Sequence, residues 1–391
     1  MKKFKLLSIA LVISLLLGGC WDRRELNDIA ITMGVGVDYD PAVKDVHLSM
    51  QIIKPDQMKA PGSGSGKGGG RGNGGGSQQA SFLLESQGRT VFEAIRQANF
   101  RSTHKINWTH SVVIILGKSA VDNGVSPLLD LFIRDPEPRP TQWILVTETE
   151  AKRILEATSP LEKASAMSID SLIKNTVNTS KAVTVDLQSF IEKLISKTTS
   201  AVAPIIKTSS EEPQELILDG TAIFKKDKMV GKLNPSETRG LLWVTGQVKG
   251  GVISFEAKRE EPVTLEIIQA SGSFKSQLNK GQPLIHLRIK VVCNLGEQET
   301  KEDMSDPEKL DFLAKKAARV VRTEITTAVK KTQQLRADAF GFGQSFYVKY
   351  PKEWKLMESR WDELFPQVKM DVKVDIAIKQ VGETTKSLRS I

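Results

Sequence analysis

The strictest hydrophobic pattern in this chain is an alternation of apolar and polar residues between positions 368 and 378, close to the end of its 391 residues. Its apolar members are Val368, Met370, Val372, Val374, Ile376 and Ile378. Alternation with period two is typical of a β-strand that buries only one face. Two stretches with helical periodicity, at 310–328 and 354–364, come before it. We therefore predict a C-terminal antiparallel sheet that these two helices cover.

The N-terminal part mixes strands and helices. Alternating residues at 31–37 and 46–52 predict a hairpin, because Asp40 and Pro41 mark a turn between them. Further strands are predicted at 82–85, 110–116 and 142–147, and helices at 91–98, 125–133 and 151–157. Residues 61–77 contain ten of the 29 glycines of the chain. A segment so poor in apolar residues cannot offset the entropy lost on ordering, so we predict a flexible loop there.

The middle of the chain is rich in strand patterns. These lie at 216–218, 221–224, 229–233, 241–244 and 251–255, with the lysine-rich segment 225–228 as a solvated hairpin tip. The fold class is therefore α+β, with three tandem domains of mixed or antiparallel sheets packed with helices. We expect an N-terminal α+β domain at 20–200, a small β-rich domain at 201–258 and a C-terminal α+β domain at 259–391.

Residues 1–19 have the pattern of a lipoprotein signal peptide. Three lysines precede an apolar run at 6–17, whose twelve residues span roughly 18 Å as a helix, too short for a hydrocarbon core of about 30 Å. Gly18 and Gly19 lead directly into Cys20, as in a lipobox. We predict cleavage after Gly19, an S-diacylglycerol group on Cys20 and an acylated new amino terminus. The alternative is a simple secreted protein whose cysteine falls there by chance.

Nothing in the sequence indicates an enzyme. Loss of the signal peptide removes three lysines and lowers the net charge from +9 to +6, a mild excess that does not favour nucleic acid. His104 and His110 flank Trp108, but no third ligand or carboxylate is close in sequence. Cys293 belongs to an apolar strand and is expected to be a small buried side chain. We predict no catalytic residue, no metal and no cofactor.

One charged segment could contact a partner. Arg134, Asp135, Glu137 and Arg139 alternate with two prolines directly after an apolar helix. The prolines stiffen the segment, which would lower the entropic cost of binding. A turn whose charges pair with each other explains the composition equally well. Both interpretations stay open from the sequence.

Several strings resemble one family throughout the chain. The string Cys-Trp-Asp-Arg-Arg-Glu-Leu-Asn-Asp at 20–28 resembles the mature start of the Ger(x)C family, the C subunits of nutrient germinant receptors in spore-forming Gram-positive bacteria. The likeness continues at 134–139, 219–225, 228–231 and 338–343, and then at Tyr350, Pro351 and Trp354. The glycine-rich insertion at 61–77 departs from the common pattern of the family.

The resemblance implies a lipoprotein on the outer face of the spore inner membrane. It also implies an A subunit with membrane spans and a permease-like B subunit as partners, and three α+β domains in an elongated arrangement. No catalytic residues accompany the family. The predicted function is therefore a non-enzymatic receptor subunit that is tethered by Cys20 and acts in spore germination. The rivals are a solute-binding lipoprotein that serves a transporter and a wall-remodelling hydrolase.

Overall fold

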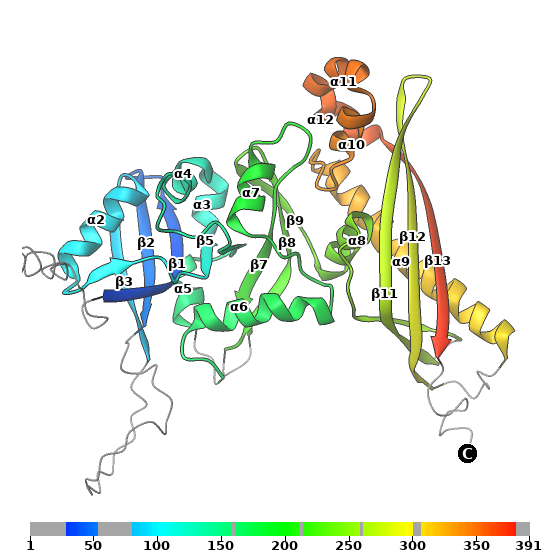
Figure 1. The fold of residues 1–391 in the computed structure, drawn as a ribbon, viewed down its shortest axis with the longest axis horizontal. Helices are drawn as coiled ribbons and strands as arrows, with labels where there is room; N and C mark the ends of the chain where they lie inside the picture. Colours follow the sequence, from blue (N-terminus) through cyan, green and yellow to red (C-terminus); the bar gives the residue numbers. More distant parts are fainter. Residues whose placement is uncertain are drawn as a thin grey trace, which may run out of the picture.

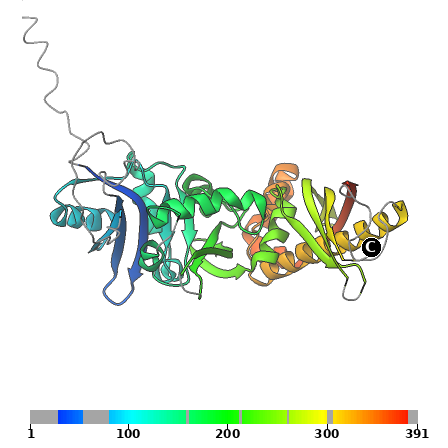
Figure 2. The same ribbon diagram turned by 90° about the horizontal axis from the view of Figure 1, so that it is seen from below.

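The computed structural model describes residues 29–53, 80–157, 161–210, 214–258, 261–299 and 306–380. Their strands form two sheets, one of nine strands and one of four, at opposite ends of an elongated α+β molecule (Figures 1 and 2). The chain runs from the first sheet to the second in sequence order, from blue to red in Figure 1. This arrangement confirms the predicted fold class. None of the helices in the described ranges combines the length and the apolar composition that a membrane span requires.

The predicted N-terminal hairpin is present. β1 (Ile29–Asp40) pairs antiparallel with β2 (Asp45–Ile53), which in turn pairs with β3 (Ser81–Gly88). On the other side of β1, the short strands β5 (Val113–Leu116) and β6 (Trp143–Val146) are parallel to it, and β4 (Lys105–Asn107) pairs with its beginning. The predicted glycine-rich loop at 61–77 lies outside the described residues.

Helices flank this sheet. They are α2 (Val91–Arg101), α3 (Lys118–Asn123), α4 (Ser126–Arg134), α5 (Ala151–Glu156), α6 (Ser165–Asn175) and α7 (Leu187–Leu194). The N-cap of α2 is Thr90, whose hydroxyl accepts the Glu93 N–H at 3.1 Å, and the Glu93 carboxylate accepts the N–H of the preceding Arg89 at 2.9 Å. Its buried side chains are Val91, Ala94 and Ala98, spaced as a helix that packs by one face.

The first sheet continues beyond the predicted boundary at residue 200. β7 (Val202–Thr208) lies beside β6 through the register pair Val146 and Ile205. β8 (Leu216–Lys225) and β9 (Lys228–Leu233) follow as an antiparallel hairpin. Lys226, at a φ of 54°, forms the predicted lysine-rich tip. The division of the chain at residues 200 and 258 stays a prediction.

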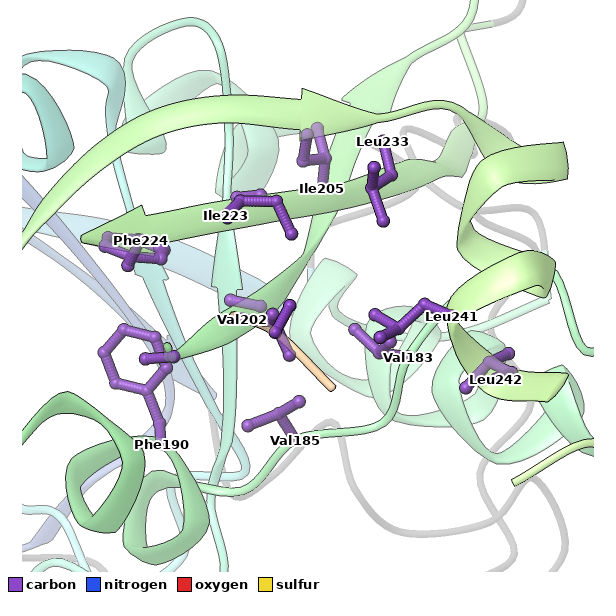
Figure 3. Packing of buried hydrophobic residues seen from close by; sticks show 14 of the residues in the cluster. Val183, Val185, Phe190, Val202, Ile205, Ile223, Phe224, Leu233, Leu241 and Leu242 are labelled. Atoms are coloured by element: carbon purple, nitrogen blue, oxygen red, sulfur yellow. The ribbon is translucent and has the colours of Figure 1, made fainter. Parts of the chain in front are cut away.

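A close-packed apolar cluster lies between these strands and the neighbouring helices (Figure 3). Phe190 of α7 meets Phe224 of β8 edge to face, with ring centroids 5.1 Å apart. Figure 3 shows Val202 and Ile223 beside them, while Leu241 and Leu242 approach from the next helix along the chain. The strands after residue 200 therefore share their core with elements from both sides of that position.

The strand predicted at 241–244 is wrong. Residues Leu241–Val244 belong to α8 (Pro235–Thr245), and all four are buried. A continuous apolar run has no period that separates strand from buried helix. The decisive local signal is at the helix start, where Asn234 and Glu237 form a capping box and Pro235 occupies the first turn.

The second sheet is mixed, and not antiparallel as predicted. β10 (Val252–Glu256), β11 (Pro262–Asn279) and β12 (Gln282–Gln298) are antiparallel neighbours, but β13 (Lys369–Gln380) runs parallel to β12. The cause is α9 (Pro307–Gln334), which returns the chain along the sheet before β13 begins (Figure 1). A parallel pair needs such a crossover connection, and this helix supplies it.

α8 and α9 approach closely because Gly240 has no side chain. A Cβ at this position would lie 2.2 Å from the Glu324 carbonyl oxygen. Beside this contact, the buried Glu324 carboxylate accepts hydrogen bonds from the Arg239 guanidinium, at 2.9 Å from Nε, and from Trp243 Nε1 at 2.8 Å. The guanidinium also donates to the Val252 carbonyl oxygen at 2.6 Å. The pair thus fixes both helices and β10 to each other.

The second predicted C-terminal helix is interrupted. It consists of α11 (Pro351–Met357), a turn at Glu358–Arg360 and α12 (Trp361–Leu364), preceded by α10 (Phe342–Lys349). These short helices gather at one end of the second sheet (Figure 1). Their aromatic side chains pack together, as in the pair Trp354 and Trp361 with ring centroids 5.2 Å apart.

A buried carboxylate organises this cluster. Asp338 accepts backbone N–H bonds from Phe340, Gly341, Phe342 and Gly343, the last at 2.7 Å, and a fifth bond from Trp361 Nε1 at 3.1 Å. Its own carbonyl oxygen accepts the Ser200 N–H at 2.8 Å. The segment 338–343 therefore connects the short helices to the end of the N-terminal part.

Candidate functional site

A hollow opens where β1, β5 and β6 end. Its volume is about 870 Å³. Its walls come from the end of β1, from β2 and β3, from α3 and from the start of α5. The lining residues are Asp38, Tyr39, Asp40, Pro41, His47, Ser49, Glu85, Lys118, Ser119, Asp122, Asn123, Thr149, Glu150, Lys152 and Arg153. The carboxyl ends of parallel strands are a common place for ligand sites in α/β sheets. Its position and size make it a candidate site.

Asp38 is the most perturbed group in this hollow. Its carboxylate lies over Gly117, where an added Cβ would be 1.6 Å from Asp38 Oδ1. Both of its oxygens accept the Ala151 N–H, at 3.0 and 3.2 Å. Burial raises the pKa of Asp38 to about 6, because the hydrogen bond from Ala151 only partly offsets the loss of hydration. Asp38 therefore holds the start of α5 beside the end of β5.

The basic side chains of the hollow are paired with acidic ones. Lys152 Nζ lies 2.8 Å from Glu85 Oε1, and Lys118 Nζ lies 2.7 Å from Asp122 Oδ2. Arg153 Nε lies 3.2 Å from Glu150 Oε2. In the part of the chain that the structure describes, no three His, Cys, Asp or Glu side chains are placed to hold a metal ion. The hollow is a polar surface whose three cations are paired and whose acidic side chains outnumber them, five to three.

The candidate partner segment at 134–139 follows α4. The Arg134 Nε donates to Asp130 Oδ2 at 2.7 Å. Asp135 Oδ1 accepts the Glu137 N–H at 2.9 Å, so the turn is fixed by its own side chain. Glu137 Oε1 lies 3.9 Å from Lys105 Nζ, and Arg139 is exposed. The structure thus contains features of both interpretations, a self-paired turn and an exposed charged edge.

The other residues singled out from the sequence are dispersed. His104 is exposed, and its Nδ1 lies 2.8 Å from the Thr103 hydroxyl. His110 is also exposed, whereas Trp108, which lies between the two histidines in the sequence, is buried. Cys293 is fully buried in β12 as a free thiol, and burial raises its pKa to about 11. Its burial confirms the predicted role as a small core residue. Cys20 lies outside the described residues, and its lipidation stays a prediction.

Sequence reasoning missed Asp38 and its hollow. Asp38 ends an apolar alternation and Gly117 follows an apolar strand, which is the local signal available. The contact between them arises only when β1 and β5 become neighbours in the sheet. Pairing of these parallel strands is not readable from either segment alone.

Two family models together match nearly the whole chain. A model described as "Spore germination protein N-terminal domain" matches residues 22–208, and one described as "Spore germination B3/GerAC like, C-terminal" matches residues 219–382. The chain belongs to the Ger(x)C family. This membership confirms the resemblance found in the sequence strings. The first model ends at the last residue of β7, and the second begins inside β8.

Individual Ger(x)C relatives align over almost their full length. "Spore germination protein KC" of Bacillus subtilis (strain 168) is 27% identical over 398 residues, covering 96% of each chain. "Spore germination protein B3" of the same organism is 24% identical and covers 98% of each chain. Among solved structures, the "Crystal Structure of the GerBC protein" matches with a TM-score of 0.58 at 19% identity, covering 91% of this chain and 99% of that one. The last comparison supports the fold.

Proposed function

We propose that this Ger(x)C chain is a non-enzymatic, lipid-anchored subunit of a nutrient germinant receptor and acts in spore germination. The observation that carries the proposal is the family match across 22–208 and 219–382, which begins two positions after the predicted lipobox cysteine Cys20. Relatives that align over nearly their whole length are named as spore germination proteins. The proposed location is the outer face of the spore inner membrane.

The proposed partners are the A and B membrane subunits of the receptor. A lipid on Cys20 confines the chain to a thin layer next to such partners and raises its effective concentration there. Within this proposal, Arg134, Asp135, Glu137 and Arg139 are candidate contacts. Their support is geometric, since the turn is already ordered by Asp135 while Arg134 and Arg139 are exposed.

A Cys20→Ala substitution tests the anchor. The variant has no thiol for diacylglycerol, so we expect the protein to leave the spore membrane fraction and the response to nutrients to fall severalfold. Cys293→Ala is the matched control, because it removes a buried thiol without touching the lipobox. The control protein should stay with the membrane. If the Cys20→Ala protein stays there as well and germination is normal, the proposal is wrong.

The hollow at the strand ends supports a second candidate, a solute-binding lipoprotein. Its volume of about 870 Å³ would accommodate a small polar solute. However, a solute-binding lipoprotein of this kind has its cleft between two lobes, and this hollow lies at the end of a single sheet with its cations already paired. Calorimetry with amino acids and sugars separates the two candidates, because only the solute-binding candidate requires heat of binding by the isolated protein.

A further inference from the structure

The exposed side of α2 carries an arginine with one phenylalanine before it and one after it. Phe92, Arg96 and Phe100 are spaced by four residues and share one side of the helix, opposite the buried Ala94 and Ala98. Phe100 is 87% exposed and Phe92 is 46% exposed. The Arg96 guanidinium carbon lies 4.7 Å from the centre of the Phe92 ring. Aromatic rings next to a cation suit the interface of a lipid bilayer, where anionic headgroups lie above apolar acyl chains.

Basic side chains surround this side of α2. Between positions 89 and 105 the chain carries four Lys or Arg residues and one acidic residue, Glu93, which accepts a backbone N–H at the start of the helix. Two of the four cations have an acidic partner at the long end of ion-pair range, since Arg89 Nε lies 3.9 Å from Asp45 Oδ1 and Lys105 Nζ lies 3.9 Å from Glu137 Oε1. We call the following residues the α2 surface: Arg89, Phe92, Arg96, Phe100, Arg101 and Lys105.

The beginning of the described chain lies beside the α2 surface. Ile29 of β1 is the register partner of Lys105 in β4. Ile29 is nine positions after Cys20, and even a fully extended chain of this length reaches at most about 30 Å. A lipid on Cys20 would therefore keep Lys105 close to a bilayer. The second sheet lies at the opposite end of the molecule (Figures 1 and 2).

We propose that the α2 surface lies on an anionic bilayer, with the two phenylalanine rings in the headgroup region and the four basic side chains against lipid phosphates. The inference rests on the lipid anchor of the proposed function, which brings the surface to the membrane. Aromatic and basic residues together bind such interfaces. The contact orients the long axis so that the second sheet points away from the membrane.

Binding to vesicles tests the surface without its lipid. The chain from residue 20 with Cys20→Ser should sediment with vesicles of phosphatidylglycerol and phosphatidylcholine, but not with phosphatidylcholine alone. Added salt should weaken binding, because it screens the basic side chains. The triple variant Arg96→Gln, Phe100→Ser and Lys105→Gln should bind these vesicles at least about tenfold more weakly than the unsubstituted protein. All three side chains are exposed, so the variant should fold normally, which circular dichroism would verify.

A matched triple variant at the far end is the control. Lys352→Gln, Lys355→Gln and Leu356→Ser also remove two cations and an exposed apolar side chain, here 80% exposed on α11. This variant should bind as strongly as the unsubstituted protein. Absence of binding to anionic vesicles, or an equal loss in both triples, overturns the proposal. Capture of a protein in place of lipid by a photocrosslinker at position 100 also overturns it. Because the test protein has no lipid, its result is independent of whether Cys20 is modified.

Discussion

Asp338 is the residue on which the local structure of the C-terminal cluster depends most. Its carboxylate accepts five N–H bonds, and replacement by alanine leaves all five donors without this acceptor in a buried place. Each buried unsatisfied donor costs about 1–3 kcal/mol, so we expect Asp338→Ala to lower the free energy of unfolding by about 3 kcal/mol or more. Urea denaturation measures the change. Asp371→Ala is the control, since this exposed carboxylate should change the same quantity by less than about 0.5 kcal/mol.

The same carboxylate makes stability depend on pH. Burial raises the pKa of Asp338 to about 6, against the opposing effect of the Gly343 and Phe342 N–H bonds, whereas the unfolded chain titrates near 3.8. The folded state therefore binds the proton more tightly. The resulting stabilisation is complete below about pH 4 and is lost as the pH rises through 6. Its size is on the order of 3 kcal/mol. Asp38, whose pKa is also raised to about 6, acts in the same direction.

Asp338→Asn isolates this effect, because the amide does not titrate. We expect the difference in unfolding free energy between the original protein and the variant to change between pH 4 and pH 7, in favour of the original protein at the acidic end. Urea denaturation of both proteins across this range gives the difference at each pH. If the two pH profiles run parallel, Asp338 has no raised pKa in the folded protein.

The sequence predicted some individual residues and missed others for a physical reason. Burial of Cys293 followed from the apolar residues next to it. The environments of Asp338 and Asp38 could not be predicted, because Trp361 and Ala151 reach them only through the tertiary fold. The string at 338–343 was recognisable as a family feature, but its hydrogen-bonding role was not.

At the scale of elements, Gly240 decides how closely α8 and α9 pack. The Cβ of an alanine would meet the Glu324 carbonyl oxygen at 2.2 Å and the Ala328 Cβ at 2.7 Å, so the helices must separate and disturb the buried Arg239 pair. We expect Gly240→Ala to lower the free energy of unfolding by about 2–3 kcal/mol, measured by urea denaturation. Gly296→Ala should have little effect, since its Cβ would meet only the Thr264 carbonyl oxygen at 3.4 Å. If Gly240→Ala and Gly296→Ala change the free energy of unfolding equally, the α8–α9 contact at Gly240 does not require glycine.

Elements with a clear period were predictable. The alternation at 368–378 became β13, and the helical stripe at 310–328 became part of α9. The run at 241–244 was misassigned because four consecutive apolar residues carry no period, and the capping box before it was the informative signal. The predicted direction of β13 was also wrong. The alternation of a strand does not reveal whether the preceding helix has returned the chain to the end of the sheet where the previous strand began.

At the scale of the whole molecule, one continuous hydrophobic core joins the two sheets and their helices. The first sheet runs through residue 200 without a break, and Ser200 is bonded to Asp338 near the second sheet. The change to strand-rich patterns after residue 200 suggested a boundary, but such patterns do not report that β6 and β7 pair. The elongated shape came from the family resemblance, and the structure confirms it.

We propose that a lipid on Cys20 holds one end of this elongated molecule at the membrane. Mass spectrometry of the N-terminal peptide from protein isolated from dormant spores tests this most directly. We expect a peptide that begins at Cys20 and carries the mass of a diacylglyceryl group on its sulfur. A peptide with an unmodified Cys20, or one that still contains residues 1–19, would show that no lipid anchors the protein through this residue.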